Sequence, residues 1–123
     1  MPRKTPRKII IDTDPGQDDA VAILLALASP DELEVIAIVA VAGNVGLQQN
    51  AKNALKIVEL SGRIDVPVFA GYDRPIRHKL VTAEHVHGKT GLDGPDLAKP
   101  KIKLGEQHGV DFIIKTIRQS AQG

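Results

Sequence analysis

The stretch IIIDTDPGQDD, residues 9–19, decides the fold of this 123-residue chain, because a run of isoleucines leads directly into four aspartates within eight positions. An unbroken β-branched run is typical of a short buried strand. Asp18 and Asp19 fall in the first turn of the helix expected next, where acids offset the helix dipole. Pro15 and Gly16 favour a tight turn between strand and helix.

Asp12 and Asp14 follow the isoleucines, so the helix dipole does not account for them. A turn or a cap is the simplest role for this pair. However, close carboxylates repel one another, and buried charge is costly unless it is compensated. A hard divalent cation would compensate it, since Ca²⁺ takes about 6–8 oxygen ligands and Mg²⁺ prefers a stricter octahedron. The spacing excludes an EF-hand, because Gly16 lies too early in a loop counted from Asp12 and Ile23 stands where the glutamate is needed.

Outward from this stretch, alternating apolar segments predict an α/β fold. Further strands are expected at residues 32–43 and 66–71, and helices at residues 18–29, 47–62 and 109–119. Pro30 would end the first helix, and Gly62 suits the C-terminal cap of the second. Strands that alternate with helices form an open, mostly parallel sheet with crossover helices.

Two polar loops are expected at the same edge of this sheet. The aspartates follow the first strand, and Asn44 in AGNVG follows the second. Ligands of such sheets bind at the carboxyl ends of the strands. Residues 72–108 then lack clear periodicity and contain all four histidines. Because long loops in compact domains are often functional lids, we expect residues 72–108 to be an active-site loop region.

Four segments of the sequence together resemble one enzyme family. They are DTDPGQDDAVAI, VAGNVGLQQNAKNA, VPVFAGYDRPI and TAEHVHGKTGLDG, at residues 12–23, 41–54, 66–76 and 82–94. The first resembles the signature of the inosine-uridine-preferring nucleoside hydrolases. The second resembles that family's second-strand loop and helix, the third its third strand, and the last its mobile active-site loop. The resemblance covers nearly all of the chain from Lys8 onward and implies a nucleoside hydrolase-like fold.

The resemblance also implies a reaction, a cofactor and a set of site residues. The reaction is hydrolysis of the N-glycosidic bond of ribonucleosides to ribose and free base, with one bound calcium. Asp14 and Asp19 would be calcium ligands, Asp14 would also be the general base for the calcium-bound water, and Asp12 would be a supporting ligand. The residues expected to bind the nucleoside are Asp18, Asn44 and His87. These residue types suit the chemistry, since a cation acidifies and orients water and a carboxylate accepts its proton.

Two other kinds of site stay open. Haloacid-dehalogenase-like magnesium phosphatases also begin with a strand and Asp-x-Asp, but Gly16 replaces their Thr or Val, and the Asp18–Asp19 pair has no place in their pattern. His85 and His87 form an H-x-H pair, but a zinc site needs at least one further ligand, and the sequence offers no convincing one nearby. His78 and His108 have no matching role and are expected on the surface.

The length of the chain bears on its activity. A chain of this family is more than twice as long, so residues 1–123 are expected to be the N-terminal part of a single nucleoside hydrolase domain. Further calcium ligands and ribose contacts would then lie elsewhere, and this chain would have an incomplete site. The alternative is a non-catalytic remnant that keeps the metal- or ribose-binding loops. By resemblance the protein is expected to form homodimers or homotetramers.

Composition narrows the remaining classes. Sixteen basic and 15 acidic residues give a net charge of +1, which provides no bulk attraction to nucleic acid. The absence of cysteine excludes disulfides and thiolate metal sites. No stretch approaches the ~18 apolar residues that a membrane span needs. A cytoplasmic protein is expected, with a small-molecule ribonucleoside as its partner and no nucleic acid or membrane.

Overall fold

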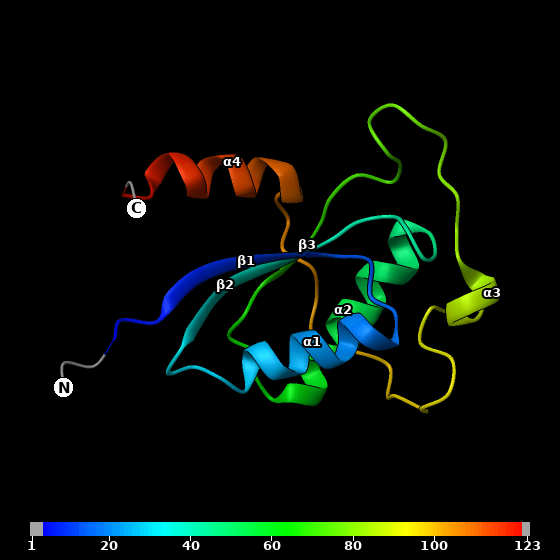
Figure 1. Cartoon of the computed structure of the whole chain (residues 1–123), viewed down its shortest axis with the longest axis horizontal. Helices are drawn as coiled ribbons and strands as arrows, with labels where there is room; N and C mark the ends of the chain where they lie inside the picture. Colours follow the sequence, from blue (N-terminus) through cyan, green and yellow to red (C-terminus); the bar gives the residue numbers. More distant parts are fainter. Residues whose placement is uncertain (1–3, 122–123) are drawn as a thin grey trace.

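A parallel sheet with helices on both of its faces organises the chain (Figure 1). The computed structural model describes residues 4–121. Its strands are β1 (Arg7–Thr13), β2 (Leu33–Ala40) and β3 (Val68–Ala70), and its helices are α1 (Gln17–Leu27), α2 (Leu47–Ser61), α3 (Glu84–His87) and α4 (Gly109–Gln119). The expected order of strands and helices is therefore confirmed. No helix in this part of the chain is long and apolar enough to cross a membrane.

The three strands lie in the order β1-β2-β3, and both neighbouring pairs are parallel. The register shifts once, because Ile9 pairs with Val35 while Ile10 pairs with Ala37, so that Ile36 is an extra residue in β2. A shift of one residue exchanges the two faces of a strand. Val35 and Ile38 consequently pack in the same cluster although they are three positions apart.

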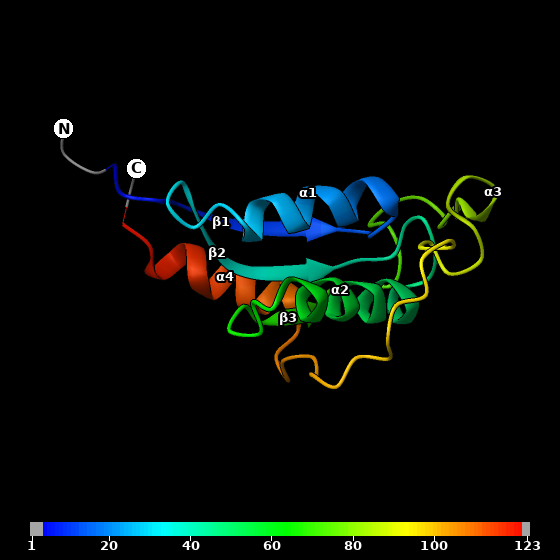
Figure 2. The same cartoon turned by 90° about the horizontal axis from the view of Figure 1, so that it is seen from below.

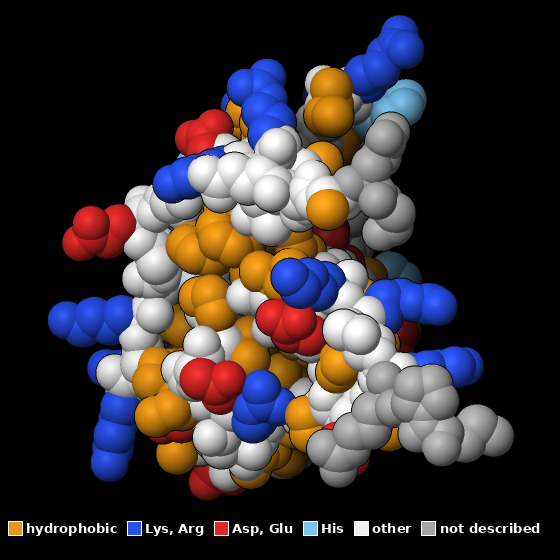
Figure 3. Space-filling model, turned by 90° about the vertical axis from the view of Figure 1, so that its left-hand side faces the viewer, with side chains coloured by type: hydrophobic (Ala, Val, Ile, Leu, Met, Phe, Trp, Pro, Cys, Tyr) orange, Lys and Arg blue, Asp and Glu red, His pale blue; other side chains and the backbone are white. Residues whose placement is uncertain are grey.

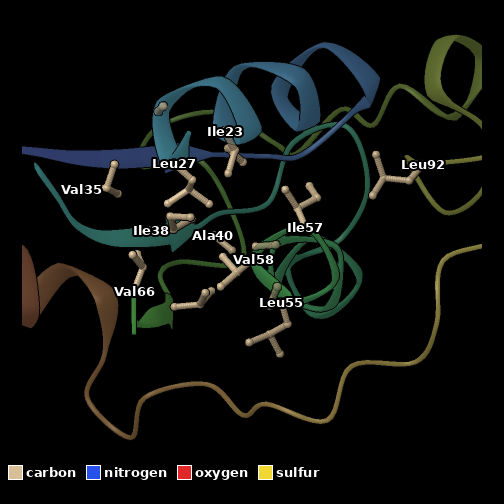
Figure 4. Packing of buried hydrophobic residues seen from close by; sticks show 14 residues of the cluster. Ile23, Leu27, Val35, Ile38, Ala40, Leu55, Ile57, Val58, Val66 and Leu92 are labelled. Carbon is tan, nitrogen blue, oxygen red and sulfur yellow. The ribbon is translucent and has the colours of Figure 1, made fainter. Parts of the chain in front are cut away.

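The larger core lies between the sheet and the pair α1 and α2 (Figure 4). Ile23 and Leu27 of α1, Ile38 of β2, and Ile57 and Val58 of α2 are all almost completely buried there. Figure 2 shows both helices alongside the strands, with the loops at the carboxyl ends of the strands extending toward α3. Gly62 ends α2 with a φ of 75°, which is the left-handed C-cap expected from the sequence.

The opposite face of the sheet is covered only in part. Phe112 of α4 stacks on Phe69 with ring centroids 4.3 Å apart, and Ile113 packs beside them. Ile114 and Ile117 remain 44% and 64% exposed. A groove of about 800 Å³ lies between α4 and β1. Figure 3 shows hydrophobic side chains gathered on the end of the molecule where β1 begins and α4 ends. The apolar side chains of α4 are therefore only partly covered.

Two of the differences from the sequence prediction bear on the site. β1 continues to Thr13, so Asp12 lies inside the strand opposite Val39 and Asp14 is the first aspartate after it. Parallel pairing to β2 extends the strand through these polar residues. The segment 72–108 also contains α3, a four-residue helix that lies beyond the carboxyl ends of the strands (Figure 1).

Candidate functional site

Asp14 and Asn44 join the loops that follow β1 and β2. Asp14 Oδ2 accepts a hydrogen bond of 2.9 Å from the Asn44 backbone N–H, and the Asn44 side-chain amide donates to the Asp14 backbone carbonyl at 2.7 Å. Gly43 allows this contact, because a Cβ at its position would collide with the Asp14 carboxylate. The two polar loops expected at one edge of the sheet therefore do meet there.

Asp19 lies on the first turn of α1 and faces back toward the strand. Its Oδ2 accepts a hydrogen bond of 2.7 Å from the hydroxyl of Thr13, which is buried at the end of β1. Burial raises the pKa of the Asp19 carboxyl, and the charges of Asp18 and Asp14 raise it further, although the Thr13 hydroxyl opposes the rise. Asp18, one position earlier, is exposed to solvent.

Asp12 is placed differently from the other acids. Its side chain lines the groove between β1 and α4. Partial burial raises the pKa of the Asp12 carboxyl, and the charge of Asp14 adds to this effect. The charge of Asp14 thus contributes to the raised pKa of both Asp12 and Asp19.

The oxygen-rich side chains at this edge are those that a hard cation would select. Burial raises the pKa values of Asp12 and Asp19, and the charges of neighbouring acids add to the rise. Among residues 4–121, however, no three histidine, aspartate or glutamate side chains converge closely enough to hold a metal ion. The chain therefore provides acids suited to a cation without assembling a full ligand set from them. Ligation by Asp12, Asp14 and Asp19 stays a prediction.

Residues 83–93 form the loop that carries His87, and we call this segment the histidine loop. Its beginning is attached to the site, because the Ala83 backbone N–H donates to the Asn44 carbonyl at 2.8 Å. His87 Nδ1 lies 2.7 Å from Gln17 Oε1, at the start of α1. The structure thus brings His87 to the helix end that carries Asp18 and Asp19, although roughly seventy positions separate them in the sequence.

Gly16 permits the close approach of His87. A Cβ at Gly16 would lie 2.5 Å from His87 Nδ1, which is too short for any real contact. The Gly16 φ of −97° is ordinary extended backbone that other residues also adopt. The expectation that this glycine serves a tight turn is therefore incomplete, because the space that His87 needs is the stronger reason for it.

Two buried asparagines of α2 donate hydrogen bonds to backbone carbonyls of the loops that form the site. The sequence analysis did not identify either of them. The Asn50 amide donates to the carbonyls of Val41 and Val45, each at 2.9 Å. The Asn53 amide donates to Thr90 O at 2.6 Å and contacts Pro15 O at 3.4 Å. A usable signal was present, since the two asparagines are three positions apart beside the alanines that mark the buried face.

Asp93 closes a turn within the histidine loop. Its carboxylate accepts hydrogen bonds from the backbone N–H groups of Lys89 and Thr90, both at 3.1 Å, and from the Thr90 hydroxyl. These donors hold the pKa of the Asp93 carboxyl below its usual value, the Thr90 hydroxyl contributing most. The turn gives the histidine loop a defined shape of its own.

The other histidines make no contact with Gln17 or Asn44 that the structure records, although His85 also belongs to the histidine loop. His78 and His85 are exposed. His108, which we expected to be a surface residue without a role, is half-buried and caps α4 by accepting a hydrogen bond from the Val110 backbone N–H at 3.2 Å. Its ring also lies against Tyr72, with centroids 4.7 Å apart. His108 therefore has a structural role, contrary to the expectation, because the first turn of a helix needs acceptors for its free N–H groups.

The fold and the acid-bearing loops define a class of protein, and comparison of the sequence with known families identifies it. The model of the family described as "Inosine-uridine preferring nucleoside hydrolase" matches residues 9–122. The chain belongs to this family, as its four segments had indicated.

Individual relatives agree with this assignment. An uncharacterised protein of Schizosaccharomyces pombe is 51% identical over 116 residues, covering 94% of this chain and 37% of the relative. The pyrimidine-specific ribonucleoside hydrolase RihA of Salmonella typhimurium is 47% identical over 114 residues, covering 93% of this chain and 36% of RihA. The chain thus spans little more than a third of the length of these relatives.

Solved structures show the same relation. A purine-preferring ribonucleoside hydrolase from Gardnerella vaginalis superposes with a TM-score of 0.84 at 33% identity, covering 92% of this chain and 37% of the other. The plant nucleoside hydrolase PpNRh1 superposes with a TM-score of 0.82 at 39% identity, covering 94% of this chain and 36% of PpNRh1. The predicted nucleoside hydrolase-like fold is confirmed.

Proposed function

We propose that this chain provides the acid-bearing part of a site that hydrolyses the N-glycosidic bond of ribonucleosides. The observation that carries the proposal is the link between Asp14 and Asn44, which joins the loops after two neighbouring strands. The histidine loop is bonded to the same Asn44 through its backbone carbonyl. Three segments that the family resemblance associates with the reaction therefore converge at one edge of the sheet.

Each residue has a role that its position supports. Asp14 accepts the proton of the attacking water, since a carboxylate in reach of a water can act as a general base. Asp18, exposed at the start of α1, binds ribose hydroxyls together with Asn44. His87 contacts the nucleoside from the histidine loop. Holding the sugar in a fixed orientation favours displacement of the base from a ribose with oxocarbenium character.

Calcium is the cofactor that these residues fit. Asp14 and Asp19 would hold it, with Asp12 in a supporting position, because all three offer the carboxylate oxygens that Ca²⁺ prefers. A bound calcium ion supplies positive charge that lowers the pKa of water and orients it. The raised pKa values of Asp12 and Asp19 support the proposal, since an added cation would offset both the burial and the neighbouring charges that raise them.

Two experiments test the proposal. Calorimetric titration of the 123-residue chain with CaCl₂ is expected to show binding that Asp14→Asn abolishes. The matched control is Asp31→Asn, an exposed acid in the turn after α1, which should bind like the parent. The second experiment uses a chimera in which residues 9–122 replace the aligned segment of Salmonella RihA, called the RihA chimera below. It should release ribose from uridine or inosine, and a chelator should stop the release.

The outcomes separate the alternatives. Chelator-sensitive ribose release by the RihA chimera supports the hydrolase proposal. Calcium binding by the chain together with a folded but inactive RihA chimera favours a non-catalytic binding remnant. Release of phosphate from a phosphomonoester, without ribose release, would favour a magnesium phosphatase. Cytoplasmic location and a homodimeric or homotetrameric state stay predictions, to be checked by cell fractionation and light scattering.

A further inference from the structure

We infer that Gln17 is a positioning residue that fixes the orientation and the tautomer of His87. The inference rests on the proposed function, in which His87 contacts the nucleoside. Gln17 stands in the centre of PGQDD, between a glycine and two acids. Its side chain is the point at which the start of α1 holds the histidine loop.

Gln17 makes three contacts with the histidine loop. Its Oε1 lies 2.7 Å from His87 Nδ1, and its Nε2 donates to the backbone carbonyls of His87 at 3.4 Å and of Asp93 at 3.2 Å. The two carbonyls accept hydrogen bonds only, so they require the NH₂ end of the amide to face them. The amide orientation is thereby determined, and Oε1 is the atom presented to the imidazole.

This orientation has a consequence for the histidine. Oε1 is an acceptor, so Nδ1 must carry the hydrogen of the pair. In the neutral ring, Nε2 is then the nitrogen with the unshared electron pair, and it can accept a hydrogen bond from a hydroxyl group. A partner at one ring nitrogen commonly sets the role of the other in this way. Gln17 thus prepares His87 to receive a hydroxyl of the nucleoside.

Neighbouring contacts keep the arrangement in place. Gly16 leaves the space that the His87 ring occupies. Asn53 holds Thr90 on the far side of the loop, and Asp93 closes the turn whose carbonyl Gln17 contacts. His87 is therefore held from its ring, its own carbonyl and the following turn. Groups fixed in advance lose little entropy when substrate binds.

The test measures the tautomer directly in the substrate-free 123-residue chain. Multiple-bond ¹H–¹⁵N spectra of the imidazole, assigned with His87→Asn, should show hydrogen on Nδ1 in the parent. Gln17→Met keeps the length of the side chain but removes the acceptor, so the hydrogen should move to Nε2. Gln17→Glu restores an acceptor and should return it to Nδ1. Gln48→Met, an exposed glutamine on α2, is the matched control and should leave the spectrum unchanged.

A second variant reaches the same ring by another route. Gly16→Ala fits the backbone at φ −97° but places a Cβ against His87, so it should also move hydrogen to Nε2. Hydrogen on Nε2 in the parent, or the parental tautomer retained in Gln17→Met, would overturn the inference. In the RihA chimera, Gln17→Met should raise KM more than it lowers kcat, and Gln17→Glu should recover part of the loss.

This readout is independent of turnover. A tautomer shift in Gln17→Met with an inactive RihA chimera would support the positioning role and count against the hydrolase proposal. An active RihA chimera, together with an unchanged His87 tautomer in Gln17→Met, would support the hydrolase proposal and count against the positioning role.

Discussion

The acids near the carboxyl end of β1 and Asp93 of the histidine loop have opposite surroundings. Asp93 receives two backbone N–H groups and a hydroxyl, and its pKa is lowered. Asp12 and Asp19 lie near other acids, and local desolvation together with these charges raises their pKa values. The Thr13 hydroxyl and the Asp14 backbone oppose the rise at Asp19 without cancelling it. Hydrogen-bond donors of the protein thus stabilise the charged form of Asp93, whereas the surroundings of Asp12 and Asp19 disfavour their charged forms.

The difference separates structural acids from functional ones. A carboxylate that is surrounded by donors stabilises a turn and has little remaining capacity for a ligand. Acids with raised pKa values, gathered where strands end, are candidates for chemistry because their interactions are incomplete without a further charge. Four predictions test this separation, beginning with the largest effect.

Asp14→Asn is expected to have the largest effect, because Asp14 is proposed both to accept the proton and to bind the cation. Loss of a general base typically costs about 10²–10⁴-fold in rate. The kcat of the RihA chimera should fall by at least that range, while its circular dichroism stays that of a folded protein. Near-normal kcat in this variant would remove Asp14 from the proposed mechanism.

Asp18→Ala should have the next largest effect, a fall in kcat/KM. A hydrogen bond to a charged group is worth about 1.5–3 kcal/mol, so kcat/KM should fall roughly 10- to 100-fold. The control is Asp111→Ala, since Asp111 is also an acid in the first turn of a helix but lies on α4. If both variants gave equal kinetics, Asp18 would be only a helix-dipole residue.

Asp12→Asn should change how stability depends on pH. The raised native pKa means that the folded chain keeps the Asp12 proton in a window above the unfolded value of 3.8. Stability then falls as pH rises through that window, because the native state binds more protons than the unfolded state. The variant should lose this fall in urea unfolding at a series of pH values, measured without calcium. A pH dependence identical to the parent's would contradict the assignment.

Asp93→Asn should act in the opposite direction and most weakly. The lowered pKa of Asp93 contributes stability that is present above pH 3.8 and is lost as pH falls through the native pKa. The variant should lack this acid-sensitive part, and the amide hydrogens of Lys89 and Thr90 should exchange faster with solvent. Unchanged exchange at both amides would show that the turn does not depend on the carboxylate.

Most of the fold could be predicted from the sequence because its signals are local. Apolar runs located the strands, and the left-handed Gly62 ended α2 as expected. The end of β1 was less predictable, since pairing with β2 carries the strand through Asp12 to Thr13. The half-exposed α4 was also unpredictable, because an apolar pattern does not reveal how much of a helix face finds a partner.

The candidate site was predictable only in part. The meeting of Asp14 with Asn44 follows from parallel strands, whose carboxyl ends share one edge. The contact between Gln17 and His87 joins residues 70 positions apart, and no periodic pattern encodes it. The capping role of His108 depends on where α4 begins.

The collision between a Cβ at Gly16 and the ring of His87 has a consequence for inheritance. The two positions share one small volume, so a larger residue at the first is tolerated only with a smaller or displaced residue at the second. Descendants of this sequence should therefore change the two positions together. Gly16 looks like part of a local turn motif, but in this protein it is required by the histidine loop, about seventy positions away in the sequence.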